Sequence, residues 1–146
     1  MWERLRIRTG VDICQIAALR QAVERAPQLA TELFHPAEAA YCRTLREPWP
    51  SFAARFAAKE AFAKAIDLDL LTVELDQIEV RRDASGRPRI RLDNEALRDR
   101  VRRALAGDPL DVDLSMSHDA EYAIASVAVL VVANVEEASK TDTWPW

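Results

Sequence analysis

The segment FAARFAAKEAFAKAI, residues 52–66, decides the fold of this chain of 146 residues. Alanine, lysine, glutamate and arginine are strong helix formers, and nothing inside the segment breaks a helix, so we predict a helix over its whole length. Ser51 would cap this helix, because Pro48 and Pro50 should end the helix before it. The many alanines leave a slim surface that lets another backbone or a ligand come close.

Three charged side chains, Lys59, Glu60 and Lys64, interrupt this apolar segment. Glu60 and Lys64 are four residues apart and share a helix face, which is the spacing of an ordinary surface ion pair. A solvated helix face is therefore the simplest interpretation. However, the surrounding alanines and phenylalanines leave these charges almost no polar neighbours, and burying them would be costly without a partner. Mg2+ with a diphosphate would be such a partner, since substrate phosphates complete a coordination shell begun by one or two carboxylates.

A strand is predicted before the helices, because apolar and polar residues alternate from residue 4 to residue 13. Its polar face ends in Gly10 and Asp12, so a carboxylate lies beside bare backbone that a phosphorylated ligand could approach. The alternative role for Asp12 is to cap the next helix, which helical spacing of apolar residues predicts over 16–26.

The remaining segments predict one domain of helices and strands, residues 1–133, followed by a polar tail, residues 134–146. Further expected elements are a helix over 36–45, two short strands around the turn 83–88, a helix over 95–106, and a hairpin with strands 112–117 and 122–133 near the sheet centre. Ser115 lies on the polar side of the last hairpin, and His118 stands at its turn, where a lone histidine is usually ordinary surface. His35, before a proline at a helix start, is assigned a structural role.

Composition excludes several classes of protein. The chain is 49% hydrophobic with a net charge of -4, which favours a globular domain and argues against nucleic acid as a partner. It contains no Walker loop, no G-x-S-x-G and no Cys/His cluster. Cys14 and Cys42 have no metal-ligand spacing, so both are expected to be reduced. The apolar run 122–133 is too short for a membrane helix, and the start of the chain does not resemble a signal peptide, so we expect a cytoplasmic protein without a membrane partner.

Four segments, in order, resemble the holo-acyl-carrier-protein synthase family of small 4'-phosphopantetheinyl transferases. They are GVDI at 10–13, FHPAE at 34–38, RFAAKEAFAKA at 55–65, and LSMSH at 114–118 followed by EYA at 121–123. The GRP turn at 86–88 also falls where the family has a G-K/R-P turn. The resemblance covers about residues 5 to 132, and the string R-F-A-A-K-E-A-F-x-K-A is highly specific.

The resemblance implies an enzyme that moves 4'-phosphopantetheine from coenzyme A to a serine of an apo acyl carrier protein. Asp12 and Glu60 would hold Mg2+ against the diphosphate of coenzyme A, and Lys64 would be a third catalytic residue. The residues expected to bind substrate are Lys59, Lys64, Ser115 and His118. Glu60 is a candidate for the base that takes the serine proton, either directly or through a metal-bound water, and the sequence does not decide the identity of this base.

The family fold is α+β, with a three-stranded antiparallel sheet beside a long helix, and it assembles as a homotrimer with an active site at each interface. The acidic carrier protein would dock on basic residues of the first helix, here Arg20 and Arg25. One departure is the segment IDLDL at 66–70, where the family usually continues G-T-G. Its two carboxylates would repel phosphates unless they point away, and the departures suggest a carrier of polyketide type instead of the fatty-acid carrier.

Two other functions stay open at this point. A catalytically altered relative would keep the fold and bind coenzyme A or a carrier protein without transferring anything, and the altered segment 66–70 is its support. A metal-dependent phosphohydrolase would use the same two carboxylates to cleave coenzyme A without an acceptor.

Overall fold

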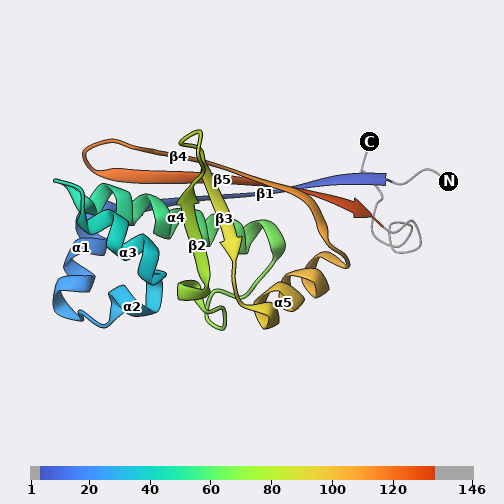
Figure 1. The fold of residues 1–146 in the computed structure, drawn as a ribbon, viewed down its shortest axis with the longest axis horizontal. Coiled ribbons are helices and arrows are strands. Elements are labelled where there is room, and N and C mark those ends of the chain that lie inside the picture. Colours follow the sequence, from blue (N-terminus) through green and yellow to red (C-terminus); the bar gives the residue numbers. More distant parts are fainter. Residues whose placement is uncertain (1–3, 134–146) are drawn as a thin grey trace, which may run out of the picture.

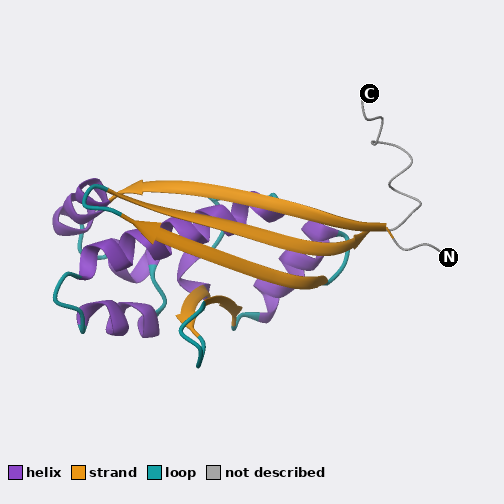
Figure 2. Cartoon of the chain, turned by 90° about the horizontal axis from the view of Figure 1, so that it is seen from above, coloured by secondary structure: helices purple, strands orange, loops and turns teal. Residues whose placement is uncertain are grey.

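A three-stranded antiparallel sheet with helices on one side forms the body of the molecule. The computed structural model describes residues 4–133 (Figure 1), so the predicted tail, residues 134–146, lies outside the described residues. The sheet has the order β1-β5-β4, with strands β1 (Arg4–Gln15), β5 (Tyr122–Ala133) and β4 (Pro109–His118). These long strands run side by side in Figure 2. The predicted α+β class with an antiparallel sheet is confirmed.

The helices fill the chain between the first and the last two strands of this sheet. They are α1 (Ile16–Arg25), α2 (Leu29–Leu33), α3 (Pro36–Arg43), α4 (Pro48–Ile66), the 3-10 helix η1 (Leu75–Gln77) and α5 (Glu95–Leu105). A second sheet of two short antiparallel strands, β2 (Ile78–Arg82) and β3 (Pro88–Leu92), lies beside α4. No helix within residues 4–133 is both long and apolar enough to cross a membrane.

Some predicted boundaries were wrong for identifiable reasons. Helix α4 begins at Pro48, not after Ser51, because proline fits the first turn of a helix, where its missing N–H has no partner to lose. Asp12 does not cap α1, since β1 continues to Gln15, which takes the cap position. In the second hairpin only β5 is central, and β4 forms a sheet edge. The short elements α2 and η1 were not predicted.

The centre of the fold is the contact between α4 and β1. A Cβ atom added to Gly10 would lie 1.8 Å from the carbonyl oxygen of Ala61 and 2.9 Å from the backbone nitrogen of Ala65. The helix backbone therefore touches the strand backbone here, which only glycine allows. The alanines of α4 have the same effect over the rest of its surface, since Ala57, Ala58 and Ala61 are fully buried.

Strand β1 buries its polar face and exposes its apolar face, the reverse of the usual arrangement. The polar face, with Gly10 and Asp12, packs against α4, whereas the apolar face is open to solvent. Its exposed fractions are 58% for Leu5, 72% for Ile7, 56% for Val11 and 61% for Ile13. On β5, which pairs with β1, Tyr122 and Ile124 are exposed while the alternate alanines and valines are buried. The sheet thus has an open apolar face opposite α4.

Replacing Gly10 with alanine should destabilise the protein by about 3 kcal/mol or more, because the added methyl group meets backbone atoms that no side-chain rotation can move. Urea denaturation of the two proteins measures the difference. Gly86→Ala is the matched control: its Cβ meets nothing within 4 Å, and only the positive φ of 86° opposes it, at a cost of about 1 kcal/mol. Equal losses from both substitutions would contradict the proposed backbone contact.

Candidate active site

Asp12 and Lys64 meet where β1 crosses α4. The Nζ of Lys64 donates to Asp12 Oδ1 at 2.7 Å and to the backbone oxygen of Val11 at 3.2 Å. The Asp12 side chain is only 10% exposed, whereas that of Lys64 is 49% exposed. The hydrogen bond and the charge of Asp12 raise the pKa of Lys64, so the lysine stays a cation. A buried carboxylate and a half-exposed ammonium group therefore lie at the rim of this contact.

The second carboxylate oxygen of Asp12 is buried and has no hydrogen-bond donor among the described residues. The Glu60 side chain, one turn of α4 before Lys64, is a close neighbour of the Asp12 carboxylate. Burial, then hydrogen bonding with Asp12 and repulsion from it, raise the pKa of Glu60 to about 7. Two carboxyl groups that are remote in sequence thus converge, and they are too close to carry two negative charges without a proton or a cation between them.

These two groups fit a magnesium ion. Mg2+ prefers oxygen ligands and is usually held by one or two carboxylates, with water and substrate phosphates in the other positions. Asp12 offers an oxygen that no described donor satisfies, and Glu60 offers a carboxylate whose negative charge a cation would stabilise. The pair predicted from sequence as metal ligands is therefore brought together within one chain.

Lys59 lies next to Glu60 in sequence but points the other way, into the core. Its Nζ forms an ion pair with Glu38 Oε2 at 2.6 Å, with both side chains completely buried, and donates to the backbone oxygens of Leu33 at 2.7 Å and Leu75 at 2.8 Å. Burial lowers the pKa of Lys59, and the charge of Glu38 opposes this effect. The ammonium group therefore has no exposed surface at which a substrate could contact it.

Ser115 and His118 do not join the Asp12 cluster within one chain. Asp12 lies opposite the buried Ala125 of β5, whereas Ser115 lies opposite the exposed Ser126. Because side chains alternate along a strand, Asp12 and Ser115 are on opposite faces of the sheet. His118 lies opposite a buried alanine, on the face of Asp12 but two strands away from it, and its side chain is exposed.

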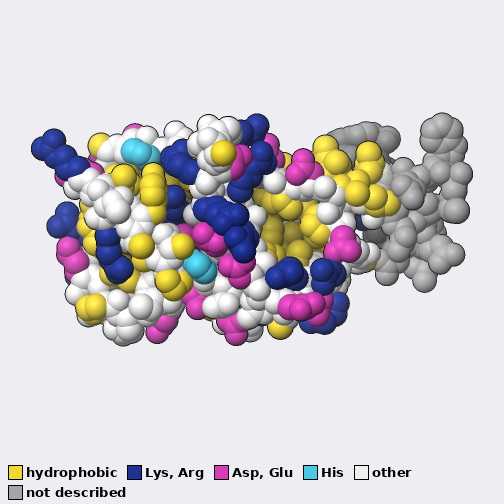
Figure 3. All heavy atoms as spheres, in the orientation of Figure 1, with side chains coloured by type: hydrophobic (Ala, Val, Ile, Leu, Met, Phe, Trp, Pro, Cys, Tyr) yellow, Lys and Arg dark blue, Asp and Glu magenta, His cyan; other side chains and the backbone are white. Residues whose placement is uncertain are grey.

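A polar pocket of about 340 Å3 borders Ser115 on the outer edge of the sheet. It is lined by Arg82, Arg87, Pro88, Asp113, Leu114, Ser115, Met116, Ser126 and Ala128. Arg87, in the turn between β2 and β3, donates to Asp113 Oδ2 at 3.0 Å, and basic side chains gather over these two strands in Figure 3. Sequence reasoning matched the turn 86–88 to the family but assigned no binding role to Arg82 or Arg87. The sequence did contain a signal for such a role, because Arg82 and Arg87 flank a short hairpin turn.

The carboxylates of the altered segment 66–70 are engaged with the chain itself. Asp67 ends α4 in the left-handed conformation, with φ 57°, and forms an ion pair with Arg8 of β1. Asp69 Oδ1 accepts a hydrogen bond from the backbone N–H of Leu71 at 2.9 Å. The repulsion expected between these carboxylates and a bound phosphate is thereby reduced, since each negative charge already has a donor.

The two cysteines are free, as predicted. Cys14 lies on β1 two residues beyond Asp12, and burial together with the charges of Glu60 and Asp12 raises its pKa to about 11. Its sulfur therefore stays a neutral thiol at physiological pH and is a poor nucleophile.

The sequence model of the 4'-phosphopantetheinyl transferase superfamily matches residues 8–127, which include all the site residues predicted from the sequence. The chain belongs to this superfamily. It is similar to the holo-[acyl-carrier-protein] synthase of Moorella thermoacetica, with 40% identity over 131 residues that span 90% of this chain and 98% of the relative. The synthase of Cytophaga hutchinsonii is 36% identical over 119 residues, which span 81% and 92% of the two chains.

Solved structures agree with this family assignment. The complex of a Chronobacterium ammoniagenes ACPS with CoA superimposes with a TM-score of 0.77 at 29% identity, and the match covers 88% of this chain and 99% of that one. The resemblance inferred from the four sequence segments is thus confirmed, and with it the prediction that the chain is a 4'-phosphopantetheinyl transferase. The roles of the individual residues remain predictions.

Glu60→Gln should raise the melting temperature of the metal-free protein at about pH 8 and change it little at about pH 5. The folded-state pKa of Glu60 is raised to about 7, so the stability contributed by the protonated carboxyl is present at low pH and is lost as the pH rises toward that value. Glutamine stays neutral throughout. Thermal denaturation at both pH values, without metal, measures the effect.

The exposed Glu95→Gln serves as the matched control and should show no such dependence on pH. Adding Mg2+ at the higher pH should stabilise the wild type and not Glu60→Gln. A variant less stable than wild type at the higher pH would contradict the convergence of Glu60 with Asp12.

Proposed function

We propose that this enzyme transfers 4'-phosphopantetheine from coenzyme A to a serine of an apo acyl carrier protein, with Mg2+ as cofactor. The observation that carries the proposal is the convergence of Asp12, Glu60 and Lys64 in a chain of this superfamily. The names of its relatives and the coenzyme A bound to related structures support the same substrates. The function proposed is therefore that of a holo-acyl-carrier-protein synthase.

Asp12 and Glu60 are the residues that would hold Mg2+. When bound, the ion would neutralise negative charge on the diphosphate during displacement at phosphorus. Lys64 has a half-exposed ammonium group on the same rim and can turn from Asp12 toward a diphosphate oxygen. The raised pKa of Glu60 suits a group that takes the serine proton near neutral pH, directly or through a water molecule. Lys59 fixes the helix turn that presents Glu60.

The carrier protein would dock beside this rim on α1. Arg20 and Arg25 are exposed there, and acyl carrier proteins are acidic partners that such side chains attract. The Nε of Arg20 donates to Glu24 at 2.8 Å, in an exposed pair whose solvation makes it easy to exchange for another carboxylate.

Incubation with coenzyme A, Mg2+ and an apo carrier protein should add the mass of one 4'-phosphopantetheinyl group to the carrier serine and release adenosine 3',5'-bisphosphate. Asp12→Asn and Glu60→Gln should each lower the rate by about a hundredfold or more, because each removes a group that faces the transferring phosphate. Mass spectrometry of the carrier follows the reaction. Glu95→Gln, in an exposed position on α5, should leave the rate unchanged.

Two results of this assay would replace the proposal with another function. Carrier binding that does not depend on Mg2+ or coenzyme A, without any added mass, would indicate a binding module. Cleavage of coenzyme A in the absence of carrier would indicate a phosphohydrolase.

We also propose that three copies assemble through the open apolar face of the sheet. Monomeric proteins rarely leave large aliphatic side chains gathered on one exposed face, as Leu5, Ile7, Val11 and Ile13 are here. Ser115 lies on this same face, opposite to Asp12. A neighbouring copy packed on the face would bring its own residues to Ser115 and complete a site of which one chain supplies only part.

Ile7→Lys should convert the trimer to monomer and lower transferase activity, because the substitution places a charge in the apolar contact. Analytical ultracentrifugation measures the assembly. Leu71→Lys is the matched control, since Leu71 is 94% exposed in the loop after α4, away from the sheet. A wild-type protein that sediments as a monomer while fully active would rule out the trimer.

A further inference from the structure

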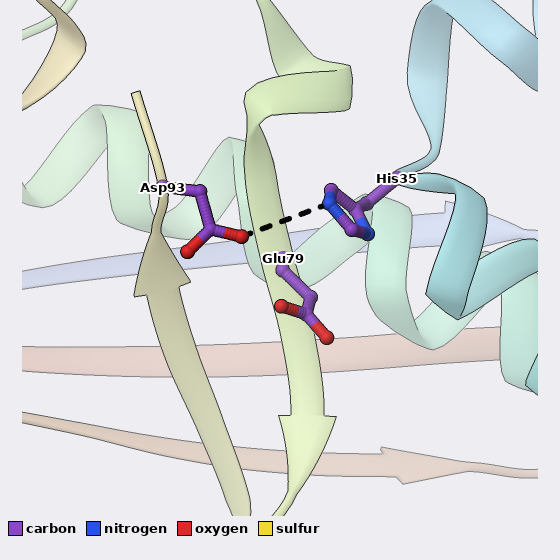
Figure 4. Close-up of side chains that lie close together, drawn as sticks. All are labelled: His35, Glu79 and Asp93. Carbon is purple, nitrogen blue, oxygen red and sulfur yellow. Dashed lines mark ion pairs between the residues drawn. The ribbon is translucent and has the colours of Figure 1, made fainter. Parts of the chain in front are cut away.

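A histidine and two carboxylates meet at a place remote in sequence from the Asp12 cluster. His35 stands at the start of α3, Glu79 on β2, and Asp93 directly after β3 (Figure 4). One ligand atom from each residue lies within 4.8 Å of those of the other two. Within residues 4–133 this is the one group of three such residues that converges in this way. None of the three belongs to the residues proposed above for catalysis or substrate binding.

Glu79 is the feature of this cluster that needs an explanation. The residue is only 7% exposed, yet its carboxylate forms no hydrogen bond or ion pair with any residue from 4 to 133. The carboxylate borders a small pocket and keeps some contact with solvent there, but no protein group in the described part of the chain balances its charge, so a bound cation would stabilise it. The facing residue on β3, Arg91, does not serve as the partner, because its Nε donates to Asp93 Oδ1 at 2.6 Å.

The other two ligands are oriented to share a cation with Glu79. The Nε2 of His35 lies 3.8 Å from Asp93 Oδ2, which is the oxygen that Arg91 leaves free. In Figure 4 the imidazole points toward Asp93, and Glu79 lies between the two segments that carry them. The side chains of His35 and Asp93 are 25% and 41% exposed, so an ion can reach the site from solvent.

We propose that His35, Glu79 and Asp93 form a second metal site, for a divalent transition-metal ion such as Zn2+. One imidazole nitrogen and two carboxylate oxygens form a ligand set that Zn2+ accepts, with water in the fourth position. Around zinc such ligand atoms lie about 3.3 Å apart, given metal–ligand distances near 2.1 Å, so the cluster must contract slightly. The partly exposed Asp93 has the freedom to make that adjustment.

Binding at this site would change one existing contact. The Nδ1 of His35 now accepts the backbone N–H of Ala37 at 3.2 Å, as a cap of α3. Coordination through Nε2 requires the proton to sit on Nδ1, so this long, exposed hydrogen bond is given up for a metal–nitrogen bond. The second bond of the cap, from His35 N–H to Glu38 Oε2 at 2.8 Å, is unaffected.

The site would fasten three segments together near the catalytic helix. It joins the start of α3 to β2 and to the end of β3, and Glu38 of α3 is bound to Lys59 of α4. Its role is therefore structural: the ion would hold the two-stranded sheet against the helices. Zn2+ that binds only the folded chain raises its stability in proportion to the logarithm of the zinc concentration.

The test uses the full chain with Asp12→Asn and Glu60→Gln as background, so that the first carboxylate pair cannot bind the added metal. Zinc titration followed by calorimetry should give one Zn2+ per chain and a raised melting temperature. His35→Asn or Glu79→Gln in this background should weaken zinc binding by about tenfold or more. His35→Asn keeps a residue that caps helices well, and Glu79→Gln keeps the size of the side chain, so both variants should fold.

Two controls identify the ligands. His118→Asn should leave zinc affinity unchanged, since His118 lies at the far end of β4. In NMR spectra of the background protein, Zn2+ should shift the ring signals of His35 and not those of His118. Absence of zinc binding in the background, or affinity that survives both His35→Asn and Glu79→Gln, would overturn the proposal.

Discussion

The backbone contact between β1 and α4 is the constraint on which the rest of the structure depends. At Gly10 the strand touches the helix at Ala61 and Ala65, and these alanines directly follow Glu60 and Lys64 in sequence. Asp12 lies two residues after Gly10 and so faces the same side of the strand. A larger residue at position 10 would push the helix outward and separate the three charged groups. Because Gly10 has no side chain, the strand lies close enough to the helix for Asp12 to reach Glu60 and Lys64.

Around this contact the molecule buries an ion pair that ties several segments to α4. Lys59 and Glu38 are both without exposed surface, and Glu38 also accepts hydrogen bonds from the backbone of His35 and Val80. A buried pair of this kind is no more stabilising than apolar packing, but removing one partner costs about 3–5 kcal/mol. Its value lies in geometry, because it fixes the start of α3, the strand β2 and the helix turn before Glu60 in one arrangement.

The sequence predicted correctly those elements and site residues that depend on local residue patterns and on the family motif. The helix that contains 52–66, the strand that carries Asp12, and the grouping of Asp12 with Glu60 and Lys64 all follow from alternation, helical spacing and the family motif. Which face of β1 is covered could not be predicted, since the usual rule buries the apolar face, and here a glycine contact buries the polar one. Nor could local spacing show that Lys59 turns inward to Glu38, because that partner comes from a different helix. The position of Ser115 depends on strand register, which only the folded sheet defines.

The open apolar face of the sheet affects how a single chain is recognised inside a cell. Four large aliphatic side chains in water raise the free energy of any chain that has not yet met a covering surface. Exposed apolar surface of this kind is what chaperones and proteases recognise in chains that are not yet covered. With the proposed trimer, the steady amount of protein would depend on how quickly copies find one another as well as on how well each one folds.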